Sequence, residues 1–424
     1  MQYVINKIGR VGQILPIPTG SLALTLEKNM MYLKQNAQFY PNLEWARVRL
    51  YKIKTGRFPW GMVETVKRVF EEWTKLNVND MCAIKDNIPI TTTEILKNLS
   101  IDLRDYQKDA IVQLVINNGG VLCLPTGAGK TFTAIEYLKI MNKKALVITT
   151  TLDIMNMWKK QVPTFVDVVN YHKIPKNYDM LKDYEIFVFD EAHHASAKTI
   201  YNISMKCGNG ILVGLTATPV REDGETLRVV AAIGETVYNI DRRSLIDRKY
   251  LADAEVKYIS YNNHTKDRFS SYQQIYKDYI VNNDDRNDSI IYCVKRHNEQ
   301  KILILVQEIE QGNTIKGLLD KEGIVSRFLH GSIKDREIKS EDRVIIGTAI
   351  FDEGINIPDF EVLVLAGGGK SSIKVTQRIG RVLRPKKDGR KCIIYDFKDE
   401  SRYLSRHYKR RRQILEEDFP VMDI

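Results

Sequence analysis

Short apolar runs alternate with amphipathic segments along most of this chain. In the first half, four apolar runs have the length and composition of buried strands. They are Gly120–Cys123, Ala145–Thr149, Ile186–Phe189 and Ile211–Leu215. After the first of them, Phe132, Ile135 and Leu138 follow helical spacing. Strands that alternate with helices in this way predict an α/β fold with a parallel sheet.

The second half of the chain repeats the alternation with four further apolar runs. They are Val325–His330, Val344–Ile346, Val362–Ala366 and Cys392–Asp396. Because 424 residues are too many for one core, the pattern predicts two tandem parallel-sheet domains. No apolar run has the length of a membrane span, and the N-terminus lacks the apolar segment of an export signal. We therefore expect a cytoplasmic protein with no membrane partner.

The first 100 residues depart from this pattern and carry no motif with assignable chemistry. They hold 14 Lys and Arg against 8 Asp and Glu, and aromatic side chains are interleaved with the basic ones between residues 39 and 73. Met62, Val66 and Phe70 predict one helix, and Asn42 predicts the start of another that ends near Gly56. Two interpretations stay open: a small nucleic-acid-binding domain, or a small core with a solvated basic face.

A glycine-rich loop lies between the first apolar run and the helix that follows it. It consists of Leu124, Pro125, Thr126, Gly127, Ala128, Gly129, Lys130 and Thr131. Glycines let successive backbone N–H groups converge on phosphate oxygens, and the N-terminus of the helix adds partial positive charge. We expect Lys130 to reach the β- and γ-phosphates of ATP and the Thr131 hydroxyl to hold Mg²⁺.

Polar residues follow the next strands at their carboxyl ends. Asp190 and Glu191 come directly after Ile186–Phe189, where a parallel sheet would place them beside the loop. We expect Asp190 to hold the Mg²⁺ and Glu191 to orient the attacking water. Because no metal-ligand spacing follows His193, we interpret it as a polar link to the next motif.

Two further groups complete the predicted nucleotide site. The hydroxyls of Thr216 and Thr218 follow a strand and are expected to couple hydrolysis to domain movement. The Gln107 amide, at the start of a helix upstream of the loop, has the donor and acceptor to pair with adenine, and Arg104 is placed with it.

Charge and cysteine content change this picture only slightly. The formal net charge of +11, from 64 Lys and Arg against 53 Asp and Glu, favours a polyanionic partner. Five widely separated cysteines without a CxxC pair predict neither a zinc site nor a disulfide framework.

The tracts Leu124–Thr131, Asp190–His193 and Thr216–Pro219, in this order and spacing, resemble the motifs of a superfamily 2 helicase motor. The longer tract Thr216–Gly224 is similar to that of the XPB-like and phage UvsW-like DNA helicases. Members of this family have two RecA-like domains, with ATP in the cleft and nucleic acid across both. The resemblance therefore implies four regions. They are a small basic N-terminal domain (1–94), two RecA-like domains (95–250 and 251–400) and a basic C-terminal helix or tail (401–424).

In the second half, Gly347–Pro358 resembles motif V of the family and Gln377–Arg384 resembles motif VI. The resemblance implies nucleotide contacts from Glu353, Gly354 and Asn356, the last standing where many relatives have Asp. Motif VI implies three catalytic residues on one helix face, which are Gln377, Arg381 and Arg384. The resemblance also implies nucleic-acid contacts, which are assigned to Thr150, Thr348 and Lys370.

Two basic segments need separate interpretation. The tract Ala366–Ser371 imitates a second phosphate loop, but no acidic strand end follows it before motif VI, so we interpret it as a loop. The segment Arg402–Arg412 predicts a basic helix that either contacts phosphates or is solvated.

The sequence thus predicts an ATP- and Mg²⁺-dependent DNA helicase or translocase. Resemblance to the UvsW-like group favours branched DNA, such as forks and recombination junctions, as the substrate in replication, recombination or repair. Expected partners are DNA and replication or recombination proteins, in a monomer or weak oligomer in the host cytoplasm if the protein is phage-encoded. Three alternatives stay open: an RNA helicase, the motor of a restriction or defence complex, and a nucleotide-gated binding protein that does not translocate.

Overall fold

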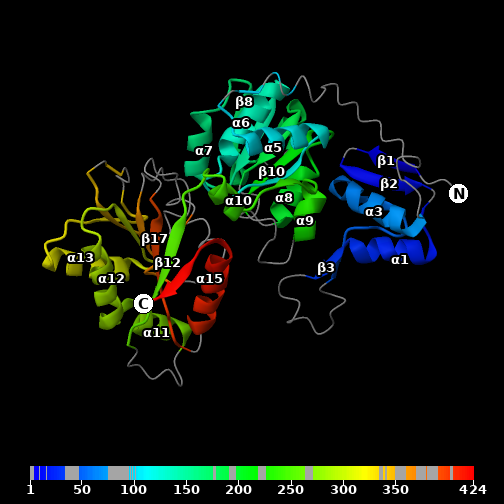
Figure 1. Cartoon of the computed structure of the whole chain (residues 1–424). Helices are drawn as coiled ribbons and strands as arrows, with labels where there is room; N and C mark the ends of the chain where they lie inside the picture. The colour runs from blue at the N-terminus through cyan, green and yellow to red at the C-terminus, as the bar shows by residue number, and fades with distance from the viewer. Residues whose placement is uncertain are drawn as a thin grey trace. The chain divides into compact units, whose positions relative to one another are not determined.

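The computed structural model of the chain divides into two compact units, Met1–Pro125 with Gly129–Ile240, and Asp241–Ile424 with Thr126–Ala128 (Figure 1). The structure describes most of both units. Described are residues 4–8, 10–15, 17–33, 47–74, 95, 97, 99–100, 102–174, 178–190, 197–217, 226–262, 271–333, 338–339, 341–348, 360–368, 379, 390–401 and 404–424. Each unit contains one large parallel sheet, which confirms the predicted α/β architecture.

The first large sheet has six parallel strands in the order β11-β6-β10-β9-β7-β8. In chain order the strands are β6 (Gly120–Cys123), β7 (Ala145–Thr149), β8 (Val166–Asn170), β9 (Ile186–Phe189), β10 (Ile211–Thr216) and β11 (Thr236–Asn239). The helices between them are α5 (Asp105–Ile116), α6 (Lys130–Met141), α7 (Leu152–Lys159), α8 (Ala197–Ser204) and α9 (Thr226–Ala232), with short 3-10 turns at Tyr171–Lys173 and Tyr178–Asp183. All four strands expected in this half form where the apolar runs predict them.

Different helices cover the two faces of this sheet. Neighbouring residues of a strand point to opposite faces, so they pack against different helices. Leu122 and Val147 pack with buried residues of α5, α6 and α7. Val121 and Leu146, one residue away in each strand, pack with α8 and α9. Strands buried on both faces read as continuous apolar runs, which is why they are visible in the sequence.

The N-terminal part of the chain folds against the first sheet unit. Its elements are β1 (Val4–Ile8), β2 (Val11–Leu15), α1 (Gly20–Asn29), β3 (Met31–Leu33), β4 (Arg47–Arg49), β5 (Arg57–Pro59), a 3-10 turn (Trp60–Met62) and α3 (Val63–Thr74). Its core includes Ala231 of α9. Arg10 Nη2 donates to the Ala232 carbonyl at 3.1 Å, and the Thr65 hydroxyl donates to Glu235 Oε1 at 3.0 Å. The N-terminal part therefore shares packed surface with the six-stranded sheet domain.

One expected helix is wrong. The segment predicted to run as a helix from Asn42 to Gly56 contains β4, which pairs antiparallel with β3, followed by a turn at residues 51–56. Strand pairing with Met31–Leu33 overrides the local helical pattern, as tertiary context commonly does for short segments. The second expected helix, around Met62 to Trp73, is confirmed as α3.

The second large sheet has seven parallel strands in the order β14-β15-β13-β16-β17-β12-β18. In chain order they are β12 (Ala254–Ile259), β13 (Ile302–Leu305), β14 (Arg327–Leu329), β15 (Val344–Gly347), β16 (Val362–Val364), β17 (Cys392–Phe397) and β18 (Val421–Asp423). The helices are α10 (Arg242–Asp247), α11 (Tyr272–Tyr276) with a π-helical turn (Lys277–Val281), α12 (Asp284–Arg296), α13 (Ile309–Lys321) and α15 (Leu404–Asp418). Residues 404–424 belong to this unit, since β18 pairs with β12 at the sheet edge.

A buried network of four charges joins α15 to the second sheet. Arg411 donates from Nε to Asp396 Oδ2 at 2.9 Å and from Nη2 to Asp399 Oδ2 at 3.1 Å. Arg286 donates from Nε to Asp399 Oδ1 at 3.3 Å. All four side chains are at most 1% exposed. The basic helix thus turns Arg411 into the core, although neither open interpretation of this segment placed it there.

Candidate nucleotide site

Four neighbouring strands of the first sheet end at the same edge and bring the predicted motifs together. Cys123, the last residue of β6, lies opposite Thr216 of β10. Phe189 of β9 lies opposite Gly214 of β10 and opposite Ile148 of β7. Thr216 at the end of β10 and the residues that follow the other three strands therefore lie at one edge of the sheet. The residues after these strands are the loop Leu124–Thr131, Asp190 and Thr150.

The loop has the backbone that a phosphate cradle requires. Gly127 and Gly129 have φ angles of 91° and 81°, in the left-handed region that side chains disfavour. Helix α6 begins at Lys130, immediately after Gly129. A Cβ atom at Gly129 would lie 2.6 Å from Gln107 Nε2, so a larger residue here would displace the end of the Gln107 side chain in addition to the strain of the positive φ. The combination of positive φ and a helix N-terminus fits a bound phosphate chain.

Lys130 is the cation at this cradle. Its side chain is only 9% exposed, and Nζ donates to the Leu124 carbonyl at 3.3 Å. The Leu124 N–H donates to the Thr216 carbonyl at 3.0 Å, which ties the start of the loop to β10. Burial raises the pKa of the neighbouring Cys123 thiol to about 11 despite the opposing charge of Lys130, so this thiol is neutral near pH 7.

Gln107 lies where an adenine reader is expected. It is 4% exposed and sits in the first turn of α5. Its Oε1 accepts from the Arg104 N–H at 3.0 Å, which directs the amide back over the helix start. The Arg104 side chain donates to the Tyr106 hydroxyl at 3.2 Å. The sequence separates Gln107 from Gly129 by 22 residues, and the fold brings them into contact.

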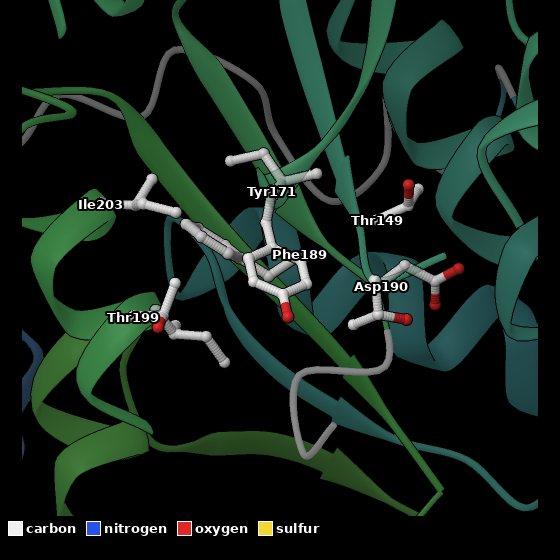
Figure 2. A pocket seen from close by; sticks show the side chains of 9 residues that line it. Thr149, Tyr171, Phe189, Asp190, Thr199 and Ile203 are labelled. Carbon is white, nitrogen blue, oxygen red and sulfur yellow. The ribbon is translucent and has the colours of Figure 1, made fainter. Parts of the chain in front are cut away.

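Asp190 is buried at the end of β9 and accepts a hydrogen bond from Trp158 Nε1 to Oδ2 at 2.6 Å. Its side chain also lines a small cavity of about 10 Å³ (Figure 2). Figure 2 shows Thr149 and Asp190 on one side of this cavity and Thr199 and Ile203 on the other. At roughly the size of one water, this cavity is far too small for a nucleotide.

The predicted nucleic-acid contacts are distributed over both units. Thr150 follows β7, and its carbonyl accepts from Asn170 Nδ2 at 2.9 Å. Thr348 follows β15 in the second unit, is 9% exposed, and donates its N–H to the Leu329 carbonyl at 3.3 Å.

Several predicted site residues lie outside the described residues, so their roles stay predictions. They are Glu191, His193, Thr218, Glu353, Gly354, Asn356, Lys370, Gln377, Arg381 and Arg384. Trp158 is a site contact that the sequence analysis missed. Because Trp158 belongs to an apolar helical stripe, the sequence predicts only that its ring packs in the core. It does not indicate that the indole N–H bonds to a site residue.

In the loop that imitates a second phosphate cradle, the Ala366 and Gly367 carbonyls and the Gly367 N–H already have hydrogen-bond partners in the second unit. The Ala366 carbonyl accepts from Arg286 Nη1 at 2.6 Å and from Gln311 Nε2 at 3.0 Å. The Gly367 carbonyl accepts from the Tyr276 hydroxyl at 2.7 Å, and the Gly367 N–H donates to Leu305. This geometry argues against a phosphate site at residues 366–368.

Two family models match the two sheet units. Residues 100–178 and 165–221 match the family "Type III restriction enzyme, res subunit", and residues 285–386 match "Helicase conserved C-terminal domain". The two parallel-sheet units and these models define the chain as an ATP-dependent helicase with two RecA-like domains.

Sequence relatives indicate which kind of helicase this chain resembles. A protein of Sulfolobus islandicus filamentous virus that is named as a candidate helicase (helicase 22) is 27% identical over 88% of this chain and 78% of its own length. The DNA 3'-5' translocase XPB2 of Sulfurisphaera tokodaii is 24% identical over 69% of this chain and 81% of its own length. The chain is thus similar to superfamily 2 helicases of the XPB type, as the motifs predict.

Solved structures agree with the fold. A fragment of an HsdR-type restriction subunit from Vibrio vulnificus matches with a TM-score of 0.61 at 17% identity, over 89% of this chain and 76% of that one. T4 UvsW covers 100% of this chain and 99% of its own, at 20% identity and a TM-score of 0.47, too loose a fit to add to the assignment. Among the described residues, no helix combines the length and apolarity needed to cross a bilayer.

Proposed function

We propose that this chain is a DNA-dependent ATPase that uses hydrolysis to unwind or translocate along DNA. The observation that carries the proposal is the sheet edge at which Gln107, Lys130, Asp190 and Thr216 converge. Nucleotide hydrolysis needs several groups from the first domain. They are a side chain that recognises the base, a loop that binds the phosphates, an acid that binds the metal and a hydroxyl.

The roles of the residues follow from their chemistry. The loop N–H groups and Lys130 bind the phosphates, and Gln107 and Arg104 are placed at the base. Thr131 and Asp190 supply the hydroxyl and carboxylate oxygens that Mg²⁺ prefers. When bound, Mg²⁺ neutralises charge on the β- and γ-phosphates.

The remaining roles rest on the family resemblance. Glu191 orients the attacking water, and Arg381 and Arg384 offset charge on the transferring phosphoryl group. Gln377 acts with these arginines, and Glu353, Gly354 and Asn356 contact the nucleotide. His193, Thr216 and Thr218 couple hydrolysis to movement, and Thr150, Thr348 and Lys370 contact nucleic acid.

The choice of DNA is supported by relatives and by the N-terminal part. The XPB2 relative is named a DNA 3'-5' translocase, and two haloarchaeal Rad25 relatives are named DNA 3'-5' helicases. Within the first unit, Lys7, Arg10, Trp60 and Lys67 line a groove of about 910 Å³, with Lys7 Nζ 5.0 Å from the centre of the Trp60 ring. Cations beside an aromatic ring suit a nucleic-acid strand.

Branched DNA in replication, recombination or repair is the substrate we propose, with replication or recombination proteins as further partners. Two relatives are virus proteins, from Sulfolobus islandicus filamentous virus and Invertebrate iridescent virus 6. We accordingly place the protein in the cytoplasm of an infected host.

One set of assays tests the proposal. ATPase rates are compared on single-stranded, duplex, forked and four-way DNA and on RNA, alongside strand separation on the same substrates. Forked or four-way DNA should stimulate hydrolysis most and be unwound. Stronger stimulation by RNA would contradict the DNA assignment, and hydrolysis without strand separation or displacement would favour a nucleotide-gated binding protein.

A second candidate is the motor subunit of a restriction or defence complex. It is favoured by the restriction-enzyme family model over residues 100–221. Such a motor translocates along duplex DNA without separating its strands. Displacement of a triplex-forming strand from linear duplex, with no unwinding of forks, would select this candidate.

A further inference from the structure

One polar contact of the predicted metal-binding acid comes from an indole. Trp158 Nε1 donates to Asp190 Oδ2 at 2.6 Å. The side chain of Trp158 is fully buried, and Asp190 is 6% exposed. No role in the nucleotide site has yet been given to this tryptophan.

The distance identifies a strong bond. Charge-assisted N–H···O bonds to carboxylates have lengths of about 2.7–2.9 Å, and the separation of 2.6 Å between Trp158 Nε1 and Asp190 Oδ2 is shorter than that range. An indole nitrogen can donate a hydrogen bond but cannot accept one. The bond therefore restricts the rotation of the Asp190 carboxylate.

The tryptophan itself is held rigidly. Trp158 lies in α7, and it belongs to the same buried cluster as Val147 of β7 and Val188 of β9. Asp190 follows β9, and its N–H donates to the Ile148 carbonyl of β7 at 3.0 Å. Both partners are thus fixed to the same two strands, and the position of the carboxylate is set by the core of the domain.

We propose that Trp158 is a positioning residue for the metal site: its N–H orients the Asp190 carboxylate that takes the nucleotide-bound divalent cation. The inference rests on the proposed function in one respect, that Asp190 is a metal ligand. Partners that orient metal ligands typically contribute about 10–100-fold to metal affinity. The effect of Trp158 should therefore appear only when a divalent cation is present.

The test measures how much Mg²⁺ strengthens nucleotide binding to the full chain. Anisotropy of a fluorescent, non-hydrolysable ATP analogue gives its affinity in EDTA and across a Mg²⁺ titration. Trp158→Phe keeps most of the ring volume and removes the N–H. We expect its affinity in EDTA to stay within about twofold, and its half-saturating Mg²⁺ concentration to rise about 10-fold or more.

Matched variants separate orientation from packing. Tyr137→Phe removes another buried polar atom, a hydroxyl with no hydrogen-bond partner among the described residues, and should leave the Mg²⁺ titration unchanged. The double variant Trp158→Phe/Asp190→Asn should lose no more than Asp190→Asn alone, because the tryptophan acts through the aspartate. If Trp158→Phe fails to fold, replacing Trp158 with 3-benzothienylalanine removes the N–H and preserves the ring shape.

The outcomes are distinguishable. A folded Trp158→Phe or benzothienylalanine protein with a wild-type Mg²⁺ titration, or with equal losses in EDTA and in Mg²⁺, overturns the inference. If Asp190→Asn also shows a wild-type titration, the metal role of Asp190 is wrong and the proposed function loses that residue. A loss in both single variants that does not add in the double variant supports both.

Discussion

At the residue scale, Gly129, which directly precedes helix α6, shows why the loop favours glycine at this position. Its φ of 81° disfavours a side chain, and a Cβ atom there would lie 2.6 Å from Gln107 Nε2. The same contact places the predicted base reader against the phosphate loop. One atom added at this position would disturb both halves of the nucleotide site.

We predict that Gly129→Ala weakens ATP binding by about 10-fold or more, since backbone strain of roughly 1–3 kcal/mol falls on the binding conformation. Nucleotide anisotropy measures the loss. Gly208→Ala is a matched control: Gly208 has a φ of 58° and an open Cβ position with no atom within 4 Å. Equal effects of the two variants on ATP affinity would show that the loop at Gly129 is not part of the site.

A substitution at Glu191 distinguishes ATP binding from ATP hydrolysis. If it orients the attacking water, Glu191→Gln should bind ATP about as tightly as the wild type and lose nearly all turnover, because the amide cannot accept a proton from water. Filter binding of labelled ATP and single-turnover hydrolysis measure the two properties. Near wild-type hydrolysis by this variant would remove Glu191 from the mechanism.

At the element scale, α15 is joined to the second sheet by buried charge. Arg411, Asp396, Asp399 and Arg286 compensate one another in a region from which water is excluded. Removing one member of such a group leaves an uncompensated charge in the core. The helix is basic in sequence, yet this arginine stabilises the fold and is unavailable to phosphate.

We predict that Arg411→Ala lowers the free energy of unfolding of the second unit by about 3–5 kcal/mol. Arg412→Ala, next to it on the same helix, should cost about 1 kcal/mol or less because its partners Glu416 and Asp423 are half exposed. Urea denaturation of the full chain, followed by circular dichroism, compares the two. Equal small losses would show that the buried network contributes no more than a surface ion pair.

At the scale of the whole molecule, the N-terminal part and the first motor domain share a core through Ala231. Deleting the N-terminal part would therefore expose apolar surface, so point substitutions test its function more cleanly. Lys7→Ala/Lys67→Ala in the groove should reduce the slope of log affinity against log salt on duplex DNA by about 1–2, with each phosphate contact contributing about 0.9. ATPase activity without DNA should not change.

The matched control for this pair is Lys52→Ala/Lys54→Ala, at two exposed positions on the turn after β4. Its salt slope should equal that of the wild type. If neither pair changes the slope, the basic N-terminal part is structural, and if only the control pair changes it, DNA binds outside the groove.

The two arginines that we propose as catalytic fall in the sequence range of the second unit. Lys130 belongs to the first unit and Arg381 and Arg384 to the second, so turnover should need both. Arg381→Ala and Arg384→Ala should bind ATP nearly normally and lose about 10³-fold or more of DNA-stimulated hydrolysis, by analogy with arginine fingers. Thermal melting excludes simple unfolding. A folded variant that hydrolyses ATP on DNA at the wild-type rate would remove that arginine from the mechanism.

The sequence by itself determined the α/β class, the two sheets and the chemistry of the loop. Strands buried on both faces of a sheet have continuous apolar sequences, so they can be recognised directly. Residues 124–131 form a local motif whose backbone conformation depends on its own glycines. Asp190 and Thr216 could be placed beside the loop because parallel strands end at one edge.

Only the tertiary structure decided which distant side chains meet. Three contacts join segments that are distant in the sequence, and no local pattern in a single sequence predicts that they meet. They are the bond of Trp158 to Asp190, the burial of Arg411 with Asp396, and the packing of the N-terminal part on Ala231. The strand at Arg47–Arg49 forms for the same reason, since its ladder partner lies outside the segment. Local pattern specifies elements and short motifs, whereas contacts between elements depend on how their faces pack.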